Sequence, residues 1–241
     1  MFQYPENEYN TESAKEILPF LVELFNPASV IDVGCGNGTW LKVFEEYPSV
    51  KEVTGVDGEN LVQADLFIDK KNFVPVDLNQ PFQLGKKADL LLCLEVAEHL
   101  EPSSAQTFIA SLCNHADVIV FSAAIPNQGG NHHINERDPE YWRKLFAANN
   151  YNAYDIFREK FWLNDRIKWW YRQNLFLYIN KEIAASYPFK PTEKIFTLVH
   201  PELLKAKETA INNYLGSEFL NSGVRPRFLQ FVEACKKKFL R

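Results

Sequence analysis

Residues 28–40 are Ala-Ser-Val-Ile-Asp-Val-Gly-Cys-Gly-Asn-Gly-Thr-Trp. Val30–Val33 is a short apolar run that contains one acid, Asp32, which is typical of a buried parallel strand. Glycines follow at positions 34, 36 and 38, and apolar residues recur at helical spacing from Trp40 onward. A strand that leads through glycines into a helix brings backbone N–H groups close to a ligand, because no Cβ atom intervenes. The stretch therefore predicts an α/β fold whose first loop binds a ligand.

The glycine spacing distinguishes between two kinds of nucleotide site. A dinucleotide site requires Gly-x-Gly-x-x-Gly, and the position of its third glycine is Thr39 here. This mismatch argues against NAD. The pattern Asp-x-Gly-x-Gly-x-Gly from Asp32 to Gly38 resembles the first motif of the class I S-adenosylmethionine-dependent methyltransferases, whose loop wraps the methionine end of the cofactor. A tight turn without a ligand is the alternative.

Further strands with acids at their ends support the resemblance. Residues 51–57 end at Asp57, about 20 residues beyond the glycine loop, and an acid at this place can accept hydrogen bonds from both hydroxyls of a ribose. Residues 72–77 are a third predicted strand, and residues 88–94 a fourth, almost wholly apolar one. Because these strands follow one another in the expected order, the pattern favours a cofactor site along their ends.

The resemblance implies a role for each strand end. Asp77 would accept a hydrogen bond from the adenine amino group, Leu78 would pack on the ring, and Glu95 and Val96 would face the methionine end and the reacting methyl group. The predicted cofactor-binding residues are Asp32, Gly34, Cys35, Gly36, Gly38, Trp40, Asp57, Gly58, Asp77, Leu78, Glu95 and Val96.

Composition and charge exclude several other classes. The chain has 241 residues, of which 46% are hydrophobic and 14% aromatic, and this is a globular profile. The formal net charge of −5 disfavours a nucleic-acid substrate. The four cysteines lack C-x-x-C spacing and are predicted to be core thiols. No signal peptide and no stretch of membrane-spanning length is recognisable, so a cytoplasmic protein without a membrane partner is expected.

Strands and helices alternate along most of the chain. After a helix that begins near Thr11, this alternation predicts a Rossmann-like, mostly parallel sheet with helices on both faces. The family resemblance adds an antiparallel pair at the sheet edge, Tyr151–Phe157 and Asn174–Asn180, which gives seven strands in all. Residues 1–182 are predicted to form the methyltransferase domain. Residues 183–241 are predicted to form a helical C-terminal extension of the same unit, which could cover the cleft, mediate a homodimer or pack behind the sheet.

The segment after the fifth predicted strand carries unusual chemistry. Gln128–Glu136 is Gln-Gly-Gly-Asn-His-His-Ile-Asn-Glu, and it lies where open α/β sheets bind their ligands. The pattern is similar to a subgroup of bacterial methyltransferases often associated with glycan or secondary-metabolite modification. A hydroxyl acceptor loses a proton during methyl transfer, and histidine is a natural base near neutral pH. His133 is the predicted base and His99 the second candidate; alternatively, His99 only bonds a backbone carbonyl.

An aromatic-rich stretch separates the last two predicted strands. Residues 158–173 are too long for a hairpin turn and contain three tryptophans, which could form a wall for a flat polar ligand such as a sugar ring. Alternatively, these aromatic residues only cover the sheet. The predicted substrate-binding residues are Gln128, Asn135, Glu136, Trp170, Tyr171 and Gln173.

The predicted function is S-adenosylmethionine-dependent methylation of a small polar acceptor, with O-methylation of a sugar, glycan precursor or secondary metabolite favoured. N-methylation of a small amine and a catalytically silent cofactor-binding or scaffolding protein are the alternatives. No metal is favoured. A magnesium ion held by His132, His133 and Glu136 is a minority possibility, because magnesium prefers carboxylates to imidazoles.

Overall fold

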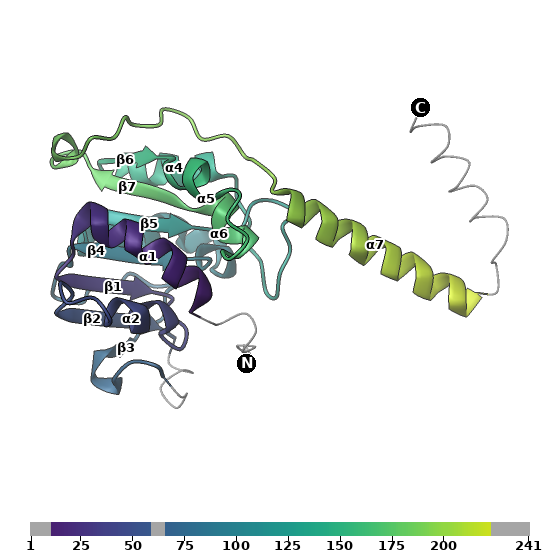
Figure 1. Cartoon of the computed structure of the whole chain (residues 1–241), viewed down its shortest axis with the longest axis horizontal. Coiled ribbons are helices and arrows are strands. Elements are labelled where there is room, and N and C mark those ends of the chain that lie inside the picture. Colours follow the sequence, from purple (N-terminus) through teal and green to yellow (C-terminus); the bar gives the residue numbers. More distant parts are fainter. Residues whose placement is uncertain (1–10, 59–65, 223–241) are drawn as a thin grey trace. The chain divides into compact units, whose positions relative to one another are not determined.

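The computed structural model describes residues 11–58 and 66–222, and side chains within these ranges up to residue 215 (Figure 1). Two compact units are present, residues 1–198 and 199–241, and each is described by itself. The end of the predicted helical extension, residues 223–241 with Cys235, lies outside the described residues. The predicted boundary between residues 182 and 183 stays a prediction.

A seven-stranded sheet forms the centre of the first unit, with the strand order β3-β2-β1-β4-β5-β7-β6. Strands β1 to β5 pair in parallel, whereas β7 is antiparallel to both β5 and β6. The predicted Rossmann-like fold is confirmed. The strands are β1 (Ser29–Val33), β2 (Glu52–Asp57), β3 (Phe73–Pro75), β4 (Leu90–Leu94), β5 (Val118–Ser122), β6 (Tyr151–Tyr154) and β7 (Phe176–Asn180).

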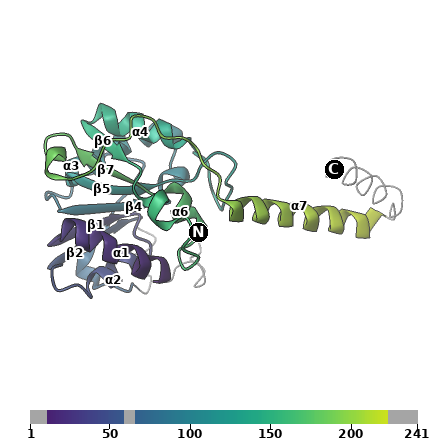
Figure 2. The same cartoon turned by 45° about the horizontal axis from the view of Figure 1, so that its top comes forward.

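Helices cover both faces of this sheet (Figures 1 and 2). The helices of the first unit are α1 (Glu12–Phe25), α2 (Thr39–Phe44), α3 (Ala105–His115), α4 (Pro139–Ala148), α5 (Phe157–Phe161) and α6 (Trp169–Asn174). The described residues of this unit also include short 3-10 helices: η2 (Lys70–Asn72), η3 (Ala97–His99), η4 (Pro102–Ser104) and η5 (Ala184–Ser186).

Alternation along the strands divides the core into two layers. Successive side chains of a strand point to opposite faces, so Leu91 of β4 packs with α3 and α4, while Leu90 and Leu92 pack with α1 and α2. The strands β4 and β5 are buried along their whole length. Both faces of the sheet are therefore occupied by helices, and a small-molecule site is expected at the ends of the strands.

β3 is shorter than predicted. Its pairing with β2 ends at Pro75, which lies opposite Asp57. Proline has no N–H group to continue a ladder. After Val76 donates to the backbone oxygen of Asp57 (2.8 Å), the chain leaves the sheet. Asp77 is therefore exposed beyond the strand, and its carboxylate accepts a hydrogen bond from the backbone N–H of Asn79 (3.0 Å).

Helices α5 and α6 fill the long connection between β6 and β7. Phe157 and Phe161 of α5 lie in the core, so part of this aromatic stretch does cover the sheet. Arg158 forms an ion pair with Asp155, and its guanidinium lies 4.7 Å from the ring centre of Phe176. Trp169, at the start of α6, is only half-buried and begins the part of the stretch that faces a pocket.

The second unit contains α7 (Pro201–Ser222), a 22-residue helix. Its described side chains are mostly exposed, including those of Leu204, Ile211 and Tyr214. Over the described part of the chain, no helix is both long enough and apolar enough to cross a membrane.

In the first unit, Cys35, Cys93 and Cys113 are buried free thiols, as predicted.

Candidate functional site

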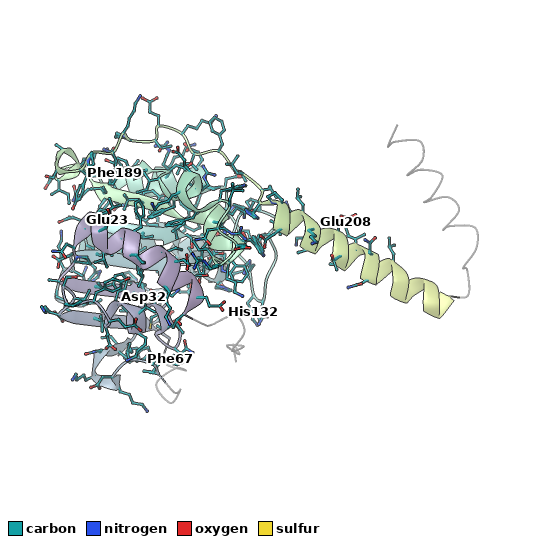
Figure 3. All side chains as sticks on the ribbon, in the orientation of Figure 1. Glu23, Asp32, Phe67, His132, Phe189 and Glu208 are labelled. Carbon is teal, nitrogen blue, oxygen red and sulfur yellow. The ribbon has the colours of Figure 1, made fainter. Side chains whose placement is uncertain are left out.

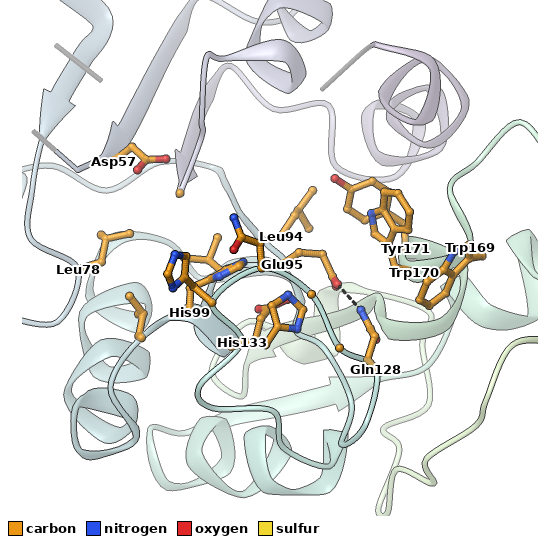
Figure 4. Close-up of a pocket in the computed structure, with 18 residues that line it drawn as sticks. Asp57, Leu78, Leu94, Glu95, His99, Gln128, His133, Trp169, Trp170 and Tyr171 are labelled. Atoms are coloured by element: carbon orange, nitrogen blue, oxygen red, sulfur yellow. Dashed lines mark hydrogen bonds between the residues drawn. The ribbon is translucent and has the colours of Figure 1, made fainter. Parts of the chain in front are cut away.

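A pocket of about 610 Å³ opens at the carboxyl ends of β1, β2 and β4, and its volume is in the range typical of small-molecule sites. It lies where the strand order reverses between β1 and β4, which is where open α/β sheets bind ligands. Asp57 lies at one end of the pocket and the aromatic residues of α6 at the other, with His99 and His133 between them (Figure 4).

Gly34, the first glycine of the loop after β1, lines the pocket. Gly34 has a φ of +78°, and a Cβ atom there would lie 2.2 Å from Cγ2 of Val96, so no larger residue fits without displacing the β4 loop. The backbone N–H of Gly34 donates to the oxygen of Val56 (2.7 Å), and that of Cys35 donates to the same atom (3.2 Å). These contacts fix the loop against both neighbouring strands.

Asp57 at the end of β2 holds the same loop. Its Oδ2 accepts a hydrogen bond from the N–H of Gly36 (2.8 Å), and its Oδ1 accepts one from Gly58 (2.7 Å). Burial raises the pKa of Asp57, although these two hydrogen bonds oppose the rise. Each carboxylate oxygen can accept more than one hydrogen bond, so Asp57 can still bind ligand hydroxyls.

Asp32 is the fourth of the five residues of β1 and lies inside the sheet (Figure 3). It is 2% exposed. Burial, and to a smaller extent the nearby Asp57, raises its pKa from 3.8 to about 8. At neutral pH, Asp32 is therefore mostly protonated in the ligand-free protein.

Glu95 marks the turn at the end of β4, and its φ of +54° is uncommon for a residue with a side chain. Its carboxylate accepts hydrogen bonds from Nε2 of Gln128 (3.1 Å) and from Nδ2 of Asn174 (3.1 and 3.2 Å). Gln173 completes this network by donating to Oε1 of Gln128 (3.1 Å). The network therefore connects α6 to the end of β4.

Glu98 and His99 follow in η3, and both line the pocket. Oε1 of Glu98 accepts a hydrogen bond from the N–H of Ala124 (3.2 Å), whereas Oε2 is buried without a hydrogen-bond partner among the described residues. Burial and the nearby carboxylate of Glu95 raise the pKa of Glu98 well above its ordinary value. Burial also lowers the pKa of His99 to about 4, so this ring is neutral at pH 7.

His133 lies next to His99, with a ring-centre distance of 4.8 Å and perpendicular rings. Its Nδ1 is 3.0 Å from Oε1 of Glu136, which also accepts a hydrogen bond from the N–H of Gly129 (2.6 Å). A Cβ atom at Gly130 would lie 2.2 Å from Nε2 of His133. Glu136 and Gly130 therefore fix the direction of the His133 ring from two sides.

The pocket brings together about half of the predicted site residues. Its lining includes these predicted residues: Gly34, Asp57, Leu78, Glu95, Val96, His99, Gln128, His133, Trp170 and Tyr171. The remaining predicted residues lie beside or behind this lining, and their roles stay predictions: Asp32, Cys35, Gly36, Gly38, Trp40, Gly58, Asp77, Asn135, Glu136 and Gln173.

Two of the predicted substrate-binding residues are engaged inside the protein. Asn135 is 2% exposed, donates from Nδ2 to the backbone oxygen of Ala97 (3.2 Å) and accepts from Arg137 (2.9 Å). Gln173 is 1% exposed within the Glu95 network. Both therefore position the pocket loops in this structure.

The sequence interpretation did not assign Glu98, Trp169 or Asn174 to the site. Trp169 lies one position before a residue that was assigned, and Glu98 lies directly before His99 in a short polar segment after a buried strand. Adjacency of this kind was a usable signal. Asn174 directly follows the assigned Gln173, so it gave the same signal, but only the tertiary structure shows that it bonds Glu95.

The family model for the methyltransferase domain matches residues 7–173, which is more than half of the chain. The chain therefore belongs to this family. It is an S-adenosylmethionine-dependent methyltransferase, in agreement with the motif at residues 32–38. None of the curated protein sequences is detectably similar to this chain.

Several solved structures share the fold. CalS10, an amino pentose methyltransferase from Micromonospora echinaspora solved with bound SAM, has a TM-score of 0.56 and 17% identity over 75% of this chain and 98% of that chain. DesVI from Streptomyces venezuelae has a TM-score of 0.54 and 14% identity over 70% and 91%. Magnesium protoporphyrin IX methyltransferase from Synechocystis, with bound SAH, has a TM-score of 0.51 and 18% identity over 75% and 90%.

We expect Asp57→Ala to weaken binding of S-adenosylhomocysteine by about 1.5–3 kcal/mol, or roughly 10- to 150-fold. The variant loses an acceptor for ligand hydroxyls and the hydrogen bond that holds Gly36. Isothermal titration calorimetry measures this loss directly. Asp69→Ala is the matched control, because Asp69 is an exposed acid paired with Lys71. Unchanged affinity in Asp57→Ala would remove Asp57 from the site.

The raised pKa of Asp32 predicts a pH dependence of stability. Between pH 3.8 and about 8 the folded protein keeps a proton that the unfolded chain has lost, so the free energy of unfolding falls as pH rises. Asp32→Asn removes this contribution, which is at most about 1.4 kcal/mol per pH unit. Urea unfolding of the cofactor-free wild type and Asp32→Asn at pH 5.5, 6.5 and 7.5 gives the change in the free energy of unfolding with pH for each protein. The same change in both proteins would contradict a raised pKa of Asp32.

Proposed function

We propose that this methyltransferase transfers a methyl group to a hydroxyl of a small polar ring, such as a sugar, glycan precursor or secondary metabolite. The observation that carries the proposal is the His133–Glu136 pair beside the pocket. The carboxylate accepts the Nδ1 proton of His133, which leaves the lone pair on Nε2 available for a proton. A general base in this position serves a hydroxyl acceptor in particular, because a neutral amine needs no base before it attacks.

The bound cofactor would supply a methyl group on a positively charged sulfur. The acceptor oxygen forms a bond to the methyl carbon, the carbon–sulfur electron pair stays on sulfur, and the hydroxyl proton passes to Nε2 of His133. Glu136 stabilises the resulting imidazolium, as a carboxylate does when it orients a catalytic histidine. His99 and Val96 contribute walls that hold the acceptor and exclude water.

The cofactor fits the end of the pocket that Asp57 and the glycine loop form. Gly34 and Asp57 both line this end, and the packing of Gly34 against Val96 holds the loop after β1 beside the loop after β4. Asp57 is proposed to accept the ribose hydroxyls. Asp77 is exposed beyond β3 and Leu78 lines the pocket, so Leu78 is proposed to contact the adenine ring and Asp77 its amino group.

The aromatic residues of α6 are proposed to bind the acceptor. Trp169, Trp170 and Tyr171 line the pocket, and the rings of Trp169 and Trp170 meet edge to face at 5.4 Å (Figure 4). Half-buried aromatic rings provide flat apolar surfaces, while Gln128 and Glu95 provide polar atoms nearby. A cyclic, hydroxylated acceptor matches this combination. The sugar substrate named for CalS10 supports the same class, as does the similarity of residues 128–136 to a subgroup associated with glycan modification.

The proposal is tested by incubating the protein with S-adenosylmethionine and a panel of sugars, nucleotide sugars, phenols and small amines. Formation of S-adenosylhomocysteine is measured, and the product is analysed by mass spectrometry and NMR. We expect a product methylated on oxygen. A product methylated on nitrogen would replace the proposed acceptor class, and binding without turnover on any acceptor would favour a silent cofactor-binding protein.

We expect His133→Ala to reduce turnover by about 10²- to 10⁴-fold, because the acceptor loses its base. Affinity for S-adenosylhomocysteine should stay nearly unchanged, since His133 lies away from Asp57. His99→Ala is the comparison for the second candidate base. Wild-type turnover in His133→Ala would refute its role, and a larger loss in His99→Ala than in His133→Ala would transfer the role to His99.

A further inference from the structure

Three side chains with metal-binding chemistry meet inside the pocket. One carboxylate oxygen of Glu98 and one ring nitrogen each of His99 and His133 lie within 4.8 Å of one another. Figure 4 shows the two histidine rings side by side at the centre of the pocket. Glu98 and His99 come from η3, whereas His133 comes from the loop after β5, so this meeting is a product of the tertiary structure.

Backbone hydrogen bonds fix the two segments against each other. The N–H groups of Ile134 and Asn135 both donate to the backbone oxygen of Glu98 (2.9 Å each). The side chain of Asn135 adds a bond to the oxygen of Ala97 (3.2 Å). The three side chains are therefore held together by a rigid frame, which is the requirement for a preformed ligand set.

Each of the three side chains also has contacts outside this cluster. Oε1 of Glu98 is bonded by Ala124, and the buried Oε2 has no hydrogen-bond partner among the described residues. Nδ1 of His133 is bonded by Glu136, which leaves Nε2. The ring of His99 contacts the backbone of Asn131 and His132, which fixes its orientation. The Glu98 carboxyl lies close to that of Glu95, and a cation beside these two buried acids would be stabilised.

We propose that Glu98, His99 and His133 bind one divalent transition-metal ion. Metal–ligand distances of about 2.0–2.2 Å place two ligand atoms at most about 4.4 Å apart, so the observed cluster needs only a small inward movement. Two imidazoles and one carboxylate suit Zn²⁺, Mn²⁺, Fe²⁺ or Co²⁺ rather than Mg²⁺. A metal ligand must be ionised, so binding of the ion would release any proton held by the Glu98 carboxyl.

The contact between His133 and Glu136 strengthens this assignment. A histidine that binds a metal commonly donates its other ring N–H to a carboxylate, which orients the ring and raises its basicity. Glu136 is the carboxylate beside Nδ1 of His133. Gly130 has no side chain and so leaves room for the edge of the ring that carries Nε2. The same geometry that supports a base therefore also supports a metal ligand.

The role of the metal ion in the reaction rests on the proposed methyl transfer. Three protein ligands leave positions open for the acceptor, and a hydroxyl bound to a divalent ion loses its proton more readily. In the metal-loaded protein, His133 holds the ion and the ion activates the hydroxyl. In the metal-free protein, Nε2 of His133 takes the proton directly. One ion would also orient two neighbouring hydroxyls of a ring acceptor.

The test is a titration of chelator-treated full-length protein with Co²⁺ chloride, followed by optical absorption. We expect one Co²⁺ per chain, with absorption bands that differ from those of aqueous Co²⁺. Glu98→Gln and His133→Gln should each weaken Co²⁺ affinity by more than 100-fold, and Glu136→Gln by about 10- to 100-fold, because it only orients His133. His132→Asn is the matched control and should bind Co²⁺ like the wild type, since its ring is exposed.

Binding of S-adenosylhomocysteine by each variant shows that the fold is intact. The inference is overturned if the wild type binds no Co²⁺, or if His132→Asn loses the ion while His133→Gln keeps it. Methyl transfer by protein that binds no Co²⁺ would refute the metal site and leave the proposed function in place. Specific Co²⁺ binding without transfer to any hydroxyl acceptor would support the metal site and refute the proposed function.

Discussion

The close approach of Gly34 to Val96 is the constraint on which the rest of the site depends. A Cβ atom at Gly34 would lie 2.2 Å from the Val96 side chain, so the loop after β1 and the loop after β4 touch at a position that only glycine permits. This contact sets the distance between the cofactor end of the pocket and η3. Asp57 supports it from β2 through its bond to Gly36. The strand order β2-β1-β4 makes all three loops neighbours.

Four buried carboxyl groups are concentrated around this contact. Asp32, Asp57, Glu95 and Glu98 all have raised pKa values, with burial as the largest cause of each. Asp57 adds to the rise at Asp32, and Glu95 adds to that at Glu98. Buried acids of this kind are stable only as neutral groups, with hydrogen-bond donors, or beside a cation. A positively charged sulfur near the glycine loop and a metal ion beside Glu98 and the two histidines would each relieve part of this cost.

The Glu95 network joins the end of β4 to the loop after β5 and to α6. Gln128 comes from the loop that carries His133, and Asn174 ends the helix that carries the aromatic residues. Both side chains donate to the carboxylate of Glu95, at the end of β4. Displacement of Glu95 would therefore move the proposed base and the aromatic wall together. Buried polar networks specify one arrangement when every member is bonded, which suits a reaction that requires accurate alignment.

The sequence by itself determined the order of strands and helices, the glycine loop and Asp57, because these features depend on local periodicity and on residues next to one another in the chain. It did not determine the early end of β3 at Pro75, which left Asp77 exposed. The tertiary structure alone decided that Gln173 and Asn135 are buried and that Asn174 reaches Glu95. It also decided that Glu98 and His99 meet His133. Such pairings depend on where the loop after β5 folds back onto η3, and this is set by backbone hydrogen bonds between distant segments that no local pattern encodes.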